Sequence, residues 1–138
     1  MRRPKARRPG VYGGKEVLTN LTREIRGIKN RTKAGVHAAG LLVKSRALPK
    51  TPVKTGNLRN SAYVISEDTK RGPVAEVGYT ASYAVFVHEI DKNYRAPGTS
   101  WKYLERAIQE SRGDILRLIR DYAGEGLSKT RIRRVRRV

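Results

Sequence analysis

Residues 51–61, Thr-Pro-Val-Lys-Thr-Gly-Asn-Leu-Arg-Asn-Ser, decide the fold because they separate a helical pattern from a strand pattern. Pro52 cannot continue the preceding helix, since proline lacks a backbone N–H and clashes with the previous turn. Gly56 supplies a position that tolerates a positive φ. Leu58 is suited to fill an apolar site, and Arg59 offers a planar charged group to a carboxylate or a carbonyl. The stretch therefore predicts a shaped polar loop that docks against another subunit.

Upstream of this loop, apolar residues recur every three or four positions, at Leu18, Leu21, Ile25, Ile28, Val36, Ala39 and Val43. This spacing marks one face of a helix and predicts a single helix from about residue 16 to residue 46. Gly27, Gly35 and Gly40 interrupt it, and a glycine inside a helix costs up to about 1 kcal/mol relative to alanine. We therefore expect packing to hold the helix together, and the glycines to mark a bend or a close approach to a sheet.

Downstream of the loop, residues 62–69 and 74–80 have the composition of strands, and Lys-Arg-Gly-Pro at 70–73 is typical of a turn. These segments predict a hairpin. In its first strand Ala62 and Val64 share one face, while Tyr63 and Ile65 share the other. Because both faces carry apolar residues, we expect one to pack on the long helix and the other to meet a neighbouring molecule.

Residues 81–90 form an apolar run that is too short to distinguish a helix from a strand. We interpret it as a short helix, and expect the 81–96 region also to extend the sheet with strand pairing. A second helix, capped by Thr99 or Ser100 and ending near Gly124, is predicted by an apolar stripe. The stripe comprises Trp101, Leu104, Ile108, Ile115, Leu118 or Ile119, and Tyr122.

These elements predict an α+β fold, in which a small antiparallel sheet carries a long N-terminal helix and a C-terminal helix packed on one face. Four aromatic residues gather around the hairpin and the start of the second helix, namely Tyr79, Tyr83, Trp101 and Tyr103. We expect most of them in the core and one or two at an interface, where tyrosine and tryptophan are enriched.

Several short motifs carry a resemblance through their order along the chain. Pro-Val-Lys-Thr-Gly-Asn-Leu-Arg-Asn-Ser at 52–61 is followed by Val-Gly at 77–78, Tyr-Ala-Val-Phe-Val at 83–87, Pro97, and Trp-Lys-Tyr-Leu-Glu-Arg-Ala at 101–107. In this order they resemble the head–tail joining, or tail-completion, family of long-tailed bacteriophages, over roughly residues 17–122. The chain departs from that family at His88-Glu89-Ile90, where relatives usually have Glu followed by a glycine turn.

The resemblance implies a structural protein of the virion neck, made in the host cytoplasm, that joins the DNA-filled head to the tail. It implies a homo-oligomeric ring, six- or twelve-fold, whose other partners are a portal-side adaptor or stopper and the tail tube. A tail terminator that caps the tail tube is a second reading within the same neck. The residues expected to dock subunits or rings are Thr55, Gly56, Asn57, Leu58, Arg59 and Ser61.

Positive charge is concentrated at the two ends of the chain. The chain has 31 Lys and Arg against 12 Asp and Glu, a net charge of +19. Residues 1–15 and 128–138 each hold six basic residues and no acid, which leaves 19 basic and 12 acidic residues, or +7 (19 − 12), in 16–127. We therefore divide the chain into a basic N-terminal arm (1–15), a single domain (16–127) and a basic C-terminal arm (128–138).

The arms are suited to sequence-independent contact with packaged DNA or with an acidic partner, because they carry few aromatic residues that could stack on bases. The residues expected to make this contact are Arg2, Arg3, Lys5, Arg7, Arg8, Lys129, Arg131, Arg133, Arg134, Arg136 and Arg137. Charge alone also fits a different class, a stand-alone basic nucleic-acid-binding protein. That alternative predicts a monomer or dimer that loses its function with its arms.

Catalysis and metal binding have no support in the sequence. There is no cysteine, which excludes disulfides and thiolate metal sites. Neither His37 nor His88 has a second ligand at metal-like spacing, and His88 and Glu89 would point about 100° apart on a helix and not cooperate. No paired carboxylates or phosphate-binding glycine loop occur, and no apolar run approaches the roughly 20 residues that span a bilayer. We expect no enzyme activity, no cofactor, no metal and no membrane partner.

Overall fold

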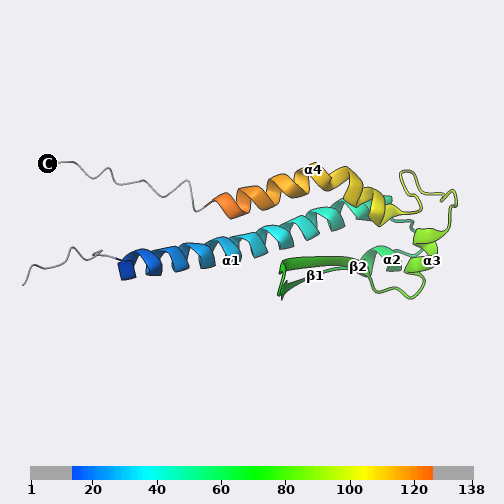
Figure 1. Ribbon diagram of the computed structural model, residues 1–138. Helices are drawn as coiled ribbons and strands as arrows, with labels where there is room; N and C mark the ends of the chain where they lie inside the picture. The colour runs from blue at the N-terminus through cyan, green and yellow to red at the C-terminus, as the bar shows by residue number, and fades with distance from the viewer. Residues whose placement is uncertain (1–13, 126–138) are drawn as a thin grey trace, which may run out of the picture.

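The computed structural model describes residues 14–125 as three layers: a β-hairpin, a long helix and a second helix (Figure 1). The elements are α1 (Gly14–Ala47), a 3-10 turn η1 (Leu48–Lys50), α2 (Asn57–Asn60), β1 (Ala62–Thr69), β2 (Gly72–Tyr79), α3 (Ala84–Glu89) and α4 (Tyr103–Gly124). Helix α1 lies in the middle, against the hairpin on one side and against α4 on the other. The predicted α+β fold is confirmed, with both long helices on the same side of the hairpin.

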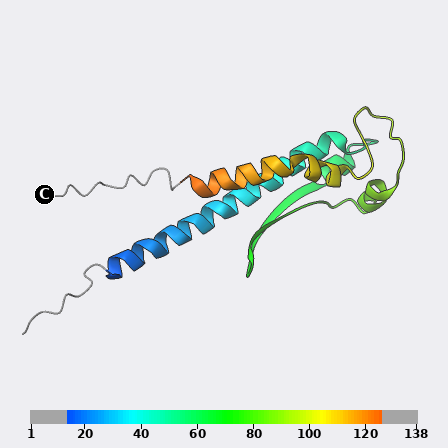
Figure 2. The same ribbon diagram turned by 45° about the horizontal axis from the view of Figure 1, so that its top comes forward.

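Helix α1 is only half covered by the rest of the described residues, 48–125. Its 34 residues span about 51 Å at 1.5 Å per residue. Every buried residue of α1 lies between Gly35 and Ala47, whereas residues 15–26 are all exposed. Figures 1 and 2 show this first part, which we call the free half of α1, extending past the ends of the hairpin and of α4. Packing within the described chain therefore supports only the second half of the predicted helix.

Two glycines of α1 allow its neighbours to approach closely. A Cβ atom added at Gly40 would lie 2.8 Å from Val64 Cγ1 in the hairpin. A Cβ atom added at Gly35 would lie 2.9 Å from the Cβ atom of Tyr122 in α4. The expectation of a close approach to the sheet is confirmed at Gly40, and Gly35 serves the same purpose toward α4.

The hairpin agrees with the prediction and presents two unlike faces. Strands β1 and β2 are antiparallel, with Val64 opposite Val77. One face meets α1, where His37 Nδ1 lies 2.7 Å from Ser66 Oγ and Lys33 forms a 2.9 Å ion pair with Asp68. On the other face Ile65 is exposed. That this outer face meets a neighbouring molecule stays a prediction.

The prediction that the 81–96 region extends the sheet is wrong. Within residues 14–125 the sheet has two strands, and the region contributes only the short helix α3. Local turns use its backbone groups, because Ala84 N donates to Ala81 O (2.9 Å) and Ile90 N donates to Phe86 O (3.0 Å). These groups are no longer available to pair with a strand.

Helix α4 begins two residues later than predicted, and neither Thr99 nor Ser100 caps it. Its N-cap is Lys102, in the left-handed region with φ 51°, and no side chain caps the helix. The backbone N–H groups of Ser100 and Lys102 instead donate to Lys50 O (3.0 Å) and His88 O (2.7 Å). These two bonds tie the loop to other elements, so tertiary contacts override the local capping preference.

The face that α4 buries differs from the predicted stripe. Its buried residues are Tyr103, Ala107 and Ser111, whereas Ile108 is exposed. Two of the three, Ala107 and Ser111, are small, as expected where two helices approach closely and leave little room for larger side chains. The predicted stripe followed other large apolar residues and missed both these small residues and Tyr103.

Candidate docking surfaces

The loop after α1 is built around Thr51, whose side chain is fully buried. Its hydroxyl donates to Ala47 O (2.8 Å) and lies 2.8 Å from the hydroxyl of Tyr79. Because Ala47 ends α1 and Tyr79 ends β2, this one side chain joins the helix to the sheet. Tyr79 packs edge-on against Tyr103, with ring centroids 5.1 Å apart. Burial is the main reason that the pKa values of both tyrosines are raised, so both hydroxyls stay neutral.

Three of the six predicted docking residues hold the loop itself together. Arg59 donates through Nε to Thr51 O (3.1 Å) and through a terminal nitrogen to Pro49 O (3.3 Å). Leu58 is buried in a core cluster with Ala84 and Tyr103. The hydroxyl of Ser61 donates to Leu58 O (2.7 Å). The predicted apolar plug at Leu58 is confirmed, and the docking roles of these residues stay predictions.

The remaining residues of the set lie at the surface of the same turn. Gly56 has φ 82°, which confirms the expected left-handed conformation, and Thr55 and Asn57 are exposed. Thr55, Gly56 and Leu58 also line a groove with a volume of about 650 Å³. The predicted loop is therefore one wall of a concave surface.

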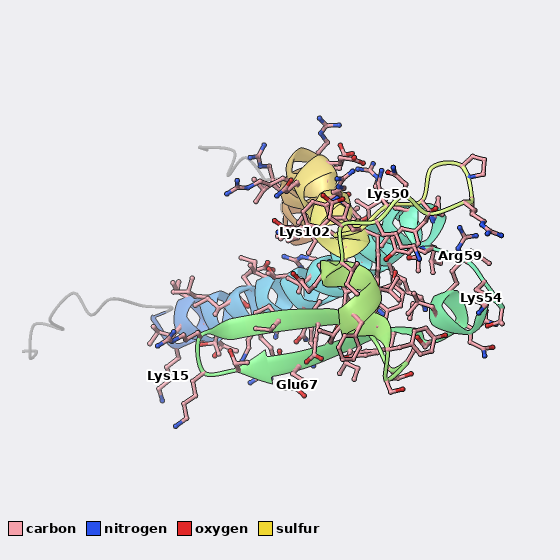
Figure 3. The ribbon with its side chains drawn as sticks, turned by 90° about the vertical axis from the view of Figure 1, so that its right-hand side faces the viewer. Lys15, Lys50, Lys54, Arg59, Glu67 and Lys102 are labelled. Atoms are coloured by element: carbon pink, nitrogen blue, oxygen red, sulfur yellow. The ribbon has the colours of Figure 1, made fainter. Side chains whose placement is uncertain are left out.

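Cationic side chains surround this groove. The charged residues that line it are Lys54, Lys92 and Arg95, and no carboxylate is among its lining residues. Figure 3 looks onto this end of the molecule and shows Lys54 and Arg59 on the same side of it. The field in the groove is therefore positive and favours an acidic partner surface.

Exposed apolar side chains extend the groove across α3. Val53 and Tyr83 line it and are each 42% exposed, and Phe86 (66%) in α3 and Ile90 (52%) at its end are exposed without lining the groove. Residues 83, 86 and 90 are spaced by three and four, so they lie along one side of α3. We call the groove together with Val53, Tyr83, Phe86 and Ile90 the α3 end surface. The sequence shows an apolar run at residues 81–90, but it does not show that several of these side chains are exposed to solvent.

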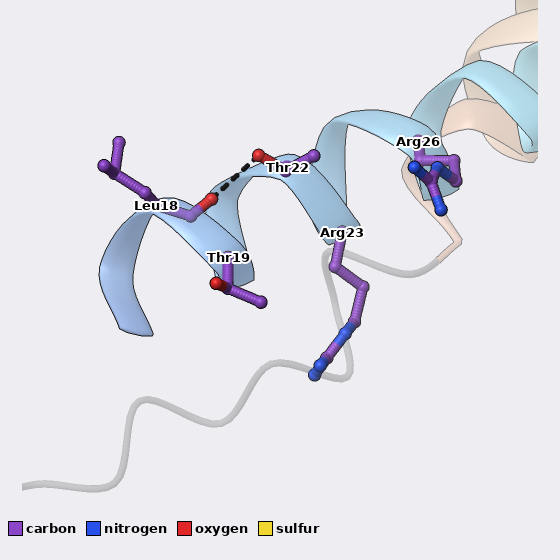
Figure 4. Close-up of a pocket in the computed structure, with 5 residues that line it drawn as sticks. All are labelled: Leu18, Thr19, Thr22, Arg23 and Arg26. Carbon is purple, nitrogen blue, oxygen red and sulfur yellow. Dashed lines mark hydrogen bonds between the residues drawn. The ribbon is translucent and has the colours of Figure 1, made fainter. Parts of the chain in front are cut away.

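A second apolar surface lies on the free half of α1. Val17, Leu18, Leu21 and Ile25 are 54–65% exposed, and we call them the free α1 stripe. They continue the helix face that Ala39 and Val43 bury farther along, because all of these positions follow one helical periodicity. Figure 4 shows Leu18 with polar residues beside it, among them Thr22, whose hydroxyl donates to Leu18 O (2.8 Å). The sequence revealed the stripe, and the structure adds that it has no cover from residues 14–125.

One ion pair joins the two long helices. Arg46 donates to the carboxylate of Asp114 (2.5 Å) and to the hydroxyl of buried Ser111 (3.1 Å). The hydrogen bond from Arg46 is the main cause that holds the pKa of Asp114 below its ordinary value of 3.8. The pair links α1 to α4, and neither residue belongs to either apolar surface.

The histidines provide no catalytic arrangement. Contrary to expectation, His88 and Glu89 do interact, with Nδ1 and Oε1 2.7 Å apart. Glu89 is the last residue of α3, and its long side chain bends back to its neighbour. Among residues 14–125 no three His, Cys, Asp or Glu side chains are grouped as a metal ion would require. In the same part of the chain no helix is both long and apolar enough to cross a membrane.

The predicted contacts of the arms with DNA lie outside the described residues. All eleven arm residues named for that role fall within 1–13 or 126–138. Residues 14–125 hold the other 20 basic residues and all 12 acidic ones, a net charge of +8 (20 − 12).

Comparison with known protein families gives a match over more than half of the chain. A protein-family model described as "Bacteriophage HK97-gp10, putative tail-component" matches residues 15–88, which is 74 of the 138 residues. The match covers all but the first residue of α1, the loop, the hairpin, and α3 up to its last residue. It therefore includes the free α1 stripe but only part of the α3 end surface, since Ile90, Lys92 and Arg95 lie beyond it. No curated protein and no solved structure matches the chain.

Proposed function

The chain belongs to the HK97-gp10-like family of bacteriophage tail components, and from this premise we propose that it forms a ring in the virion neck. The ring joins the portal or connector of the DNA-filled head to the tail. Its work is structural: it positions its neighbours and leaves a channel for DNA. The basic arms then contact the passing DNA or acidic surfaces of adjoining neck proteins.

The observation that carries this proposal is the small core of the single chain. Among residues 14–125, seven apolar residues are buried, and four of them are alanines. The large ones are only Val43, Leu58 and Tyr103, whereas fifteen large apolar or aromatic side chains are exposed. Burying one large apolar side chain contributes about 1.5–3 kcal/mol. Much of the apolar surface of residues 14–125 is therefore left uncovered by this part of the chain and is available for contacts with other chains.

The experiment is a mass measurement of the purified protein by light scattering at moderate salt, with and without portal-side neck components and tail tubes. We expect defined rings, either alone or on the neck components. Binding to tail tubes without any portal-side contact would instead assign a tail terminator. A persistent monomer that ignores the neck and binds DNA would overturn the proposal and favour the nucleic-acid-binding alternative.

A version without residues 1–10 and 128–138 sharpens this test. A neck protein without its arms keeps its fold, because every described core residue lies outside the deleted segments, and it keeps part of its docking to the neck. A protein that works only through basic arms loses all binding. The two classes therefore separate on one variant.

A further inference from the structure

We propose that neighbouring copies in the ring join head to tail, with the free α1 stripe of one copy seated on the α3 end surface of the next. This inference rests on the proposed function, because it names the contact by which that ring is built. It commits to one occupant for both surfaces, a second copy of this chain.

The two surfaces lie at opposite ends of the molecule. Figures 1 and 2 show α3 at one end and the start of α1 at the other, with the hairpin and α4 between them. One copy cannot bring these ends together, because α1 is a continuous helix of 34 residues. A contact between two different patches is heterologous, and repeating it generates a ring when the rotation between copies closes and an open filament when it does not.

The shapes of the two surfaces are complementary. The free half of α1 is a single helix that the hairpin and α4 do not cover, and it presents apolar side chains at positions 18, 21 and 25, the i, i+3, i+7 anchors of a helix that lies in a groove. The α3 end surface is concave and has an apolar rim. Two α3 end surfaces cannot fill one another, and two α1 stripes packed together would leave both grooves uncovered. Only the head-to-tail contact covers both surfaces at once.

Charge favours the same pairing. The groove carries Lys54, Lys92 and Arg95 without a lining carboxylate, so two α3 end surfaces would repel one another. The free half of α1 carries Glu16 and Glu24 together with Lys15, Arg23 and Arg26. Of the two carboxylates, Glu24 borders the stripe, three residues after Leu21, and can face these cations. A carboxylate beside an apolar stripe is the chemistry that this groove fits.

The test uses two arginine variants at exposed positions, one on each surface. Leu21→Arg places a charge in the free α1 stripe and leaves the α3 end surface intact. Phe86→Arg places a charge in the α3 end surface and leaves the stripe intact. Each variant alone should be monomeric under the condition in which the unmodified protein forms rings. Mixed in equal amounts they should form dimers of about 31 kDa (2 × 15.5) and nothing larger, because each pair has one intact contact.

Leu41→Arg is the matched control. Leu41 lies on the same helix, is 48% exposed against 54% for Leu21, and belongs to neither surface. This variant should assemble like the unmodified protein. Circular dichroism of all three variants checks that the fold is intact.

A second measurement exploits the absence of cysteine from the chain. Leu21→Cys and Phe86→Cys proteins, mixed and oxidised, should cross-link to each other far more than either does to itself, since a disulfide forms only between closely placed residues. This captures the contact even where an arginine variant fails to fold.

The outcomes that would overturn the inference differ from those that would overturn the ring. Rings formed by either arginine variant alone, dimers formed by one variant without the other, or self-cross-linking of a single cysteine variant would each reject the head-to-tail contact. None of these three outcomes contradicts the proposal that the protein forms a ring in the neck. An unmodified protein that forms no ring alone or with neck components rejects the proposed function, and this inference with it.

Discussion

At the scale of single residues, the absence of a side chain matters as much as its presence. Gly40 and Gly35 let the hairpin and α4 approach α1 to within the space that a Cβ atom would occupy. Thr51 and Arg59 act through their side chains, which donate the hydrogen bonds that shape the loop after α1. The layers are held by close backbone approach and by a few satisfied polar groups, with few large core residues.

Replacing Gly40 by alanine should lower the free energy of unfolding by about 1–3 kcal/mol, the usual effect of overpacking. Alanine favours a helix by up to about 1 kcal/mol, but its Cβ would lie 2.8 Å from Val64 Cγ1 and 3.2 Å from Ala75 Cβ. Gly113→Ala in α4 is the control, because nothing lies within 4 Å of its added Cβ, and it should stabilise. Urea unfolding of both variants measures the difference. A neutral Gly40→Ala would mean that the hairpin packs more loosely on α1 than described.

Asp114→Asn should destabilise the protein at neutral pH and have little effect in acid. The pKa of Asp114 is lowered in the folded state from 3.8, chiefly by its hydrogen bond from Arg46. Its charged form therefore stabilises the fold above pH 3.8, and this contribution is lost as the pH falls through the folded-state value. Thermal unfolding at a series of pH values should show the two curves converging below about pH 3.8. Asp121→Asn, an exposed change on the same helix, controls for general loss of negative charge.

At the scale of elements, α1 is one continuous helix whose two halves lie in different environments. Its second half is enclosed between the hairpin and α4, whereas its first half has solvent around it. A helix segment without tertiary packing has little stability of its own, since most helical stability in proteins comes from an amphipathic face that is covered. The length of α1 therefore exceeds what the described fold supports.

Hydrogen exchange should report this division directly. In unassembled protein the backbone amides of residues 15–26 should exchange much faster than those of residues 35–47, because local opening is easy where no packing opposes it. In assembled rings the first segment should become protected. Mass spectrometry of peptides from the two segments gives both values in one experiment. Equal protection in the unassembled protein would show that the first segment is stable without a partner.

The sequence predicted this element well and its surroundings poorly, for one physical reason. Periodicity predicted α1 to within two residues at its start and one at its end, and turn chemistry at Pro52 and Gly56 predicted where the chain reverses. Periodicity shows which face of a helix is apolar, but it does not show which element covers that face. For the same reason the exposure of Phe86, the small-residue contact of α4 and the missing third strand could not be derived from the pattern.

At the scale of the whole molecule, the exposed apolar surfaces and most of the net positive charge lie in different parts of the chain. The described body has a net charge of +8, and the remaining +11 lies in residues 1–13 and 126–138 (19 − 8). The two exposed apolar surfaces lie on the body, at its two ends. The contacts proposed between copies and those proposed with polyanions therefore use different parts of the chain.

Deleting residues 1–10 and 128–138 should weaken DNA binding strongly and flatten its dependence on salt, because eleven positive charges are removed. The unfolding temperature should stay unchanged. Fluorescence anisotropy with a labelled duplex at several salt concentrations measures the affinity and its slope. An unchanged slope would place the phosphate contacts on the body of the protein, and the arm assignment would be wrong.

The uncovered start of α1 also has a consequence for turnover in the infected cell. A protease cuts backbone that has opened, and the rate follows how often the segment opens. The free half of α1 contains Arg23 and Arg26 and exposes them to any enzyme that cleaves after arginine. A copy seated in a ring by the contact proposed above hides this segment, whereas a surplus copy does not. Proteolysis would then remove unassembled copies selectively, whereas copies assembled in virions would be protected.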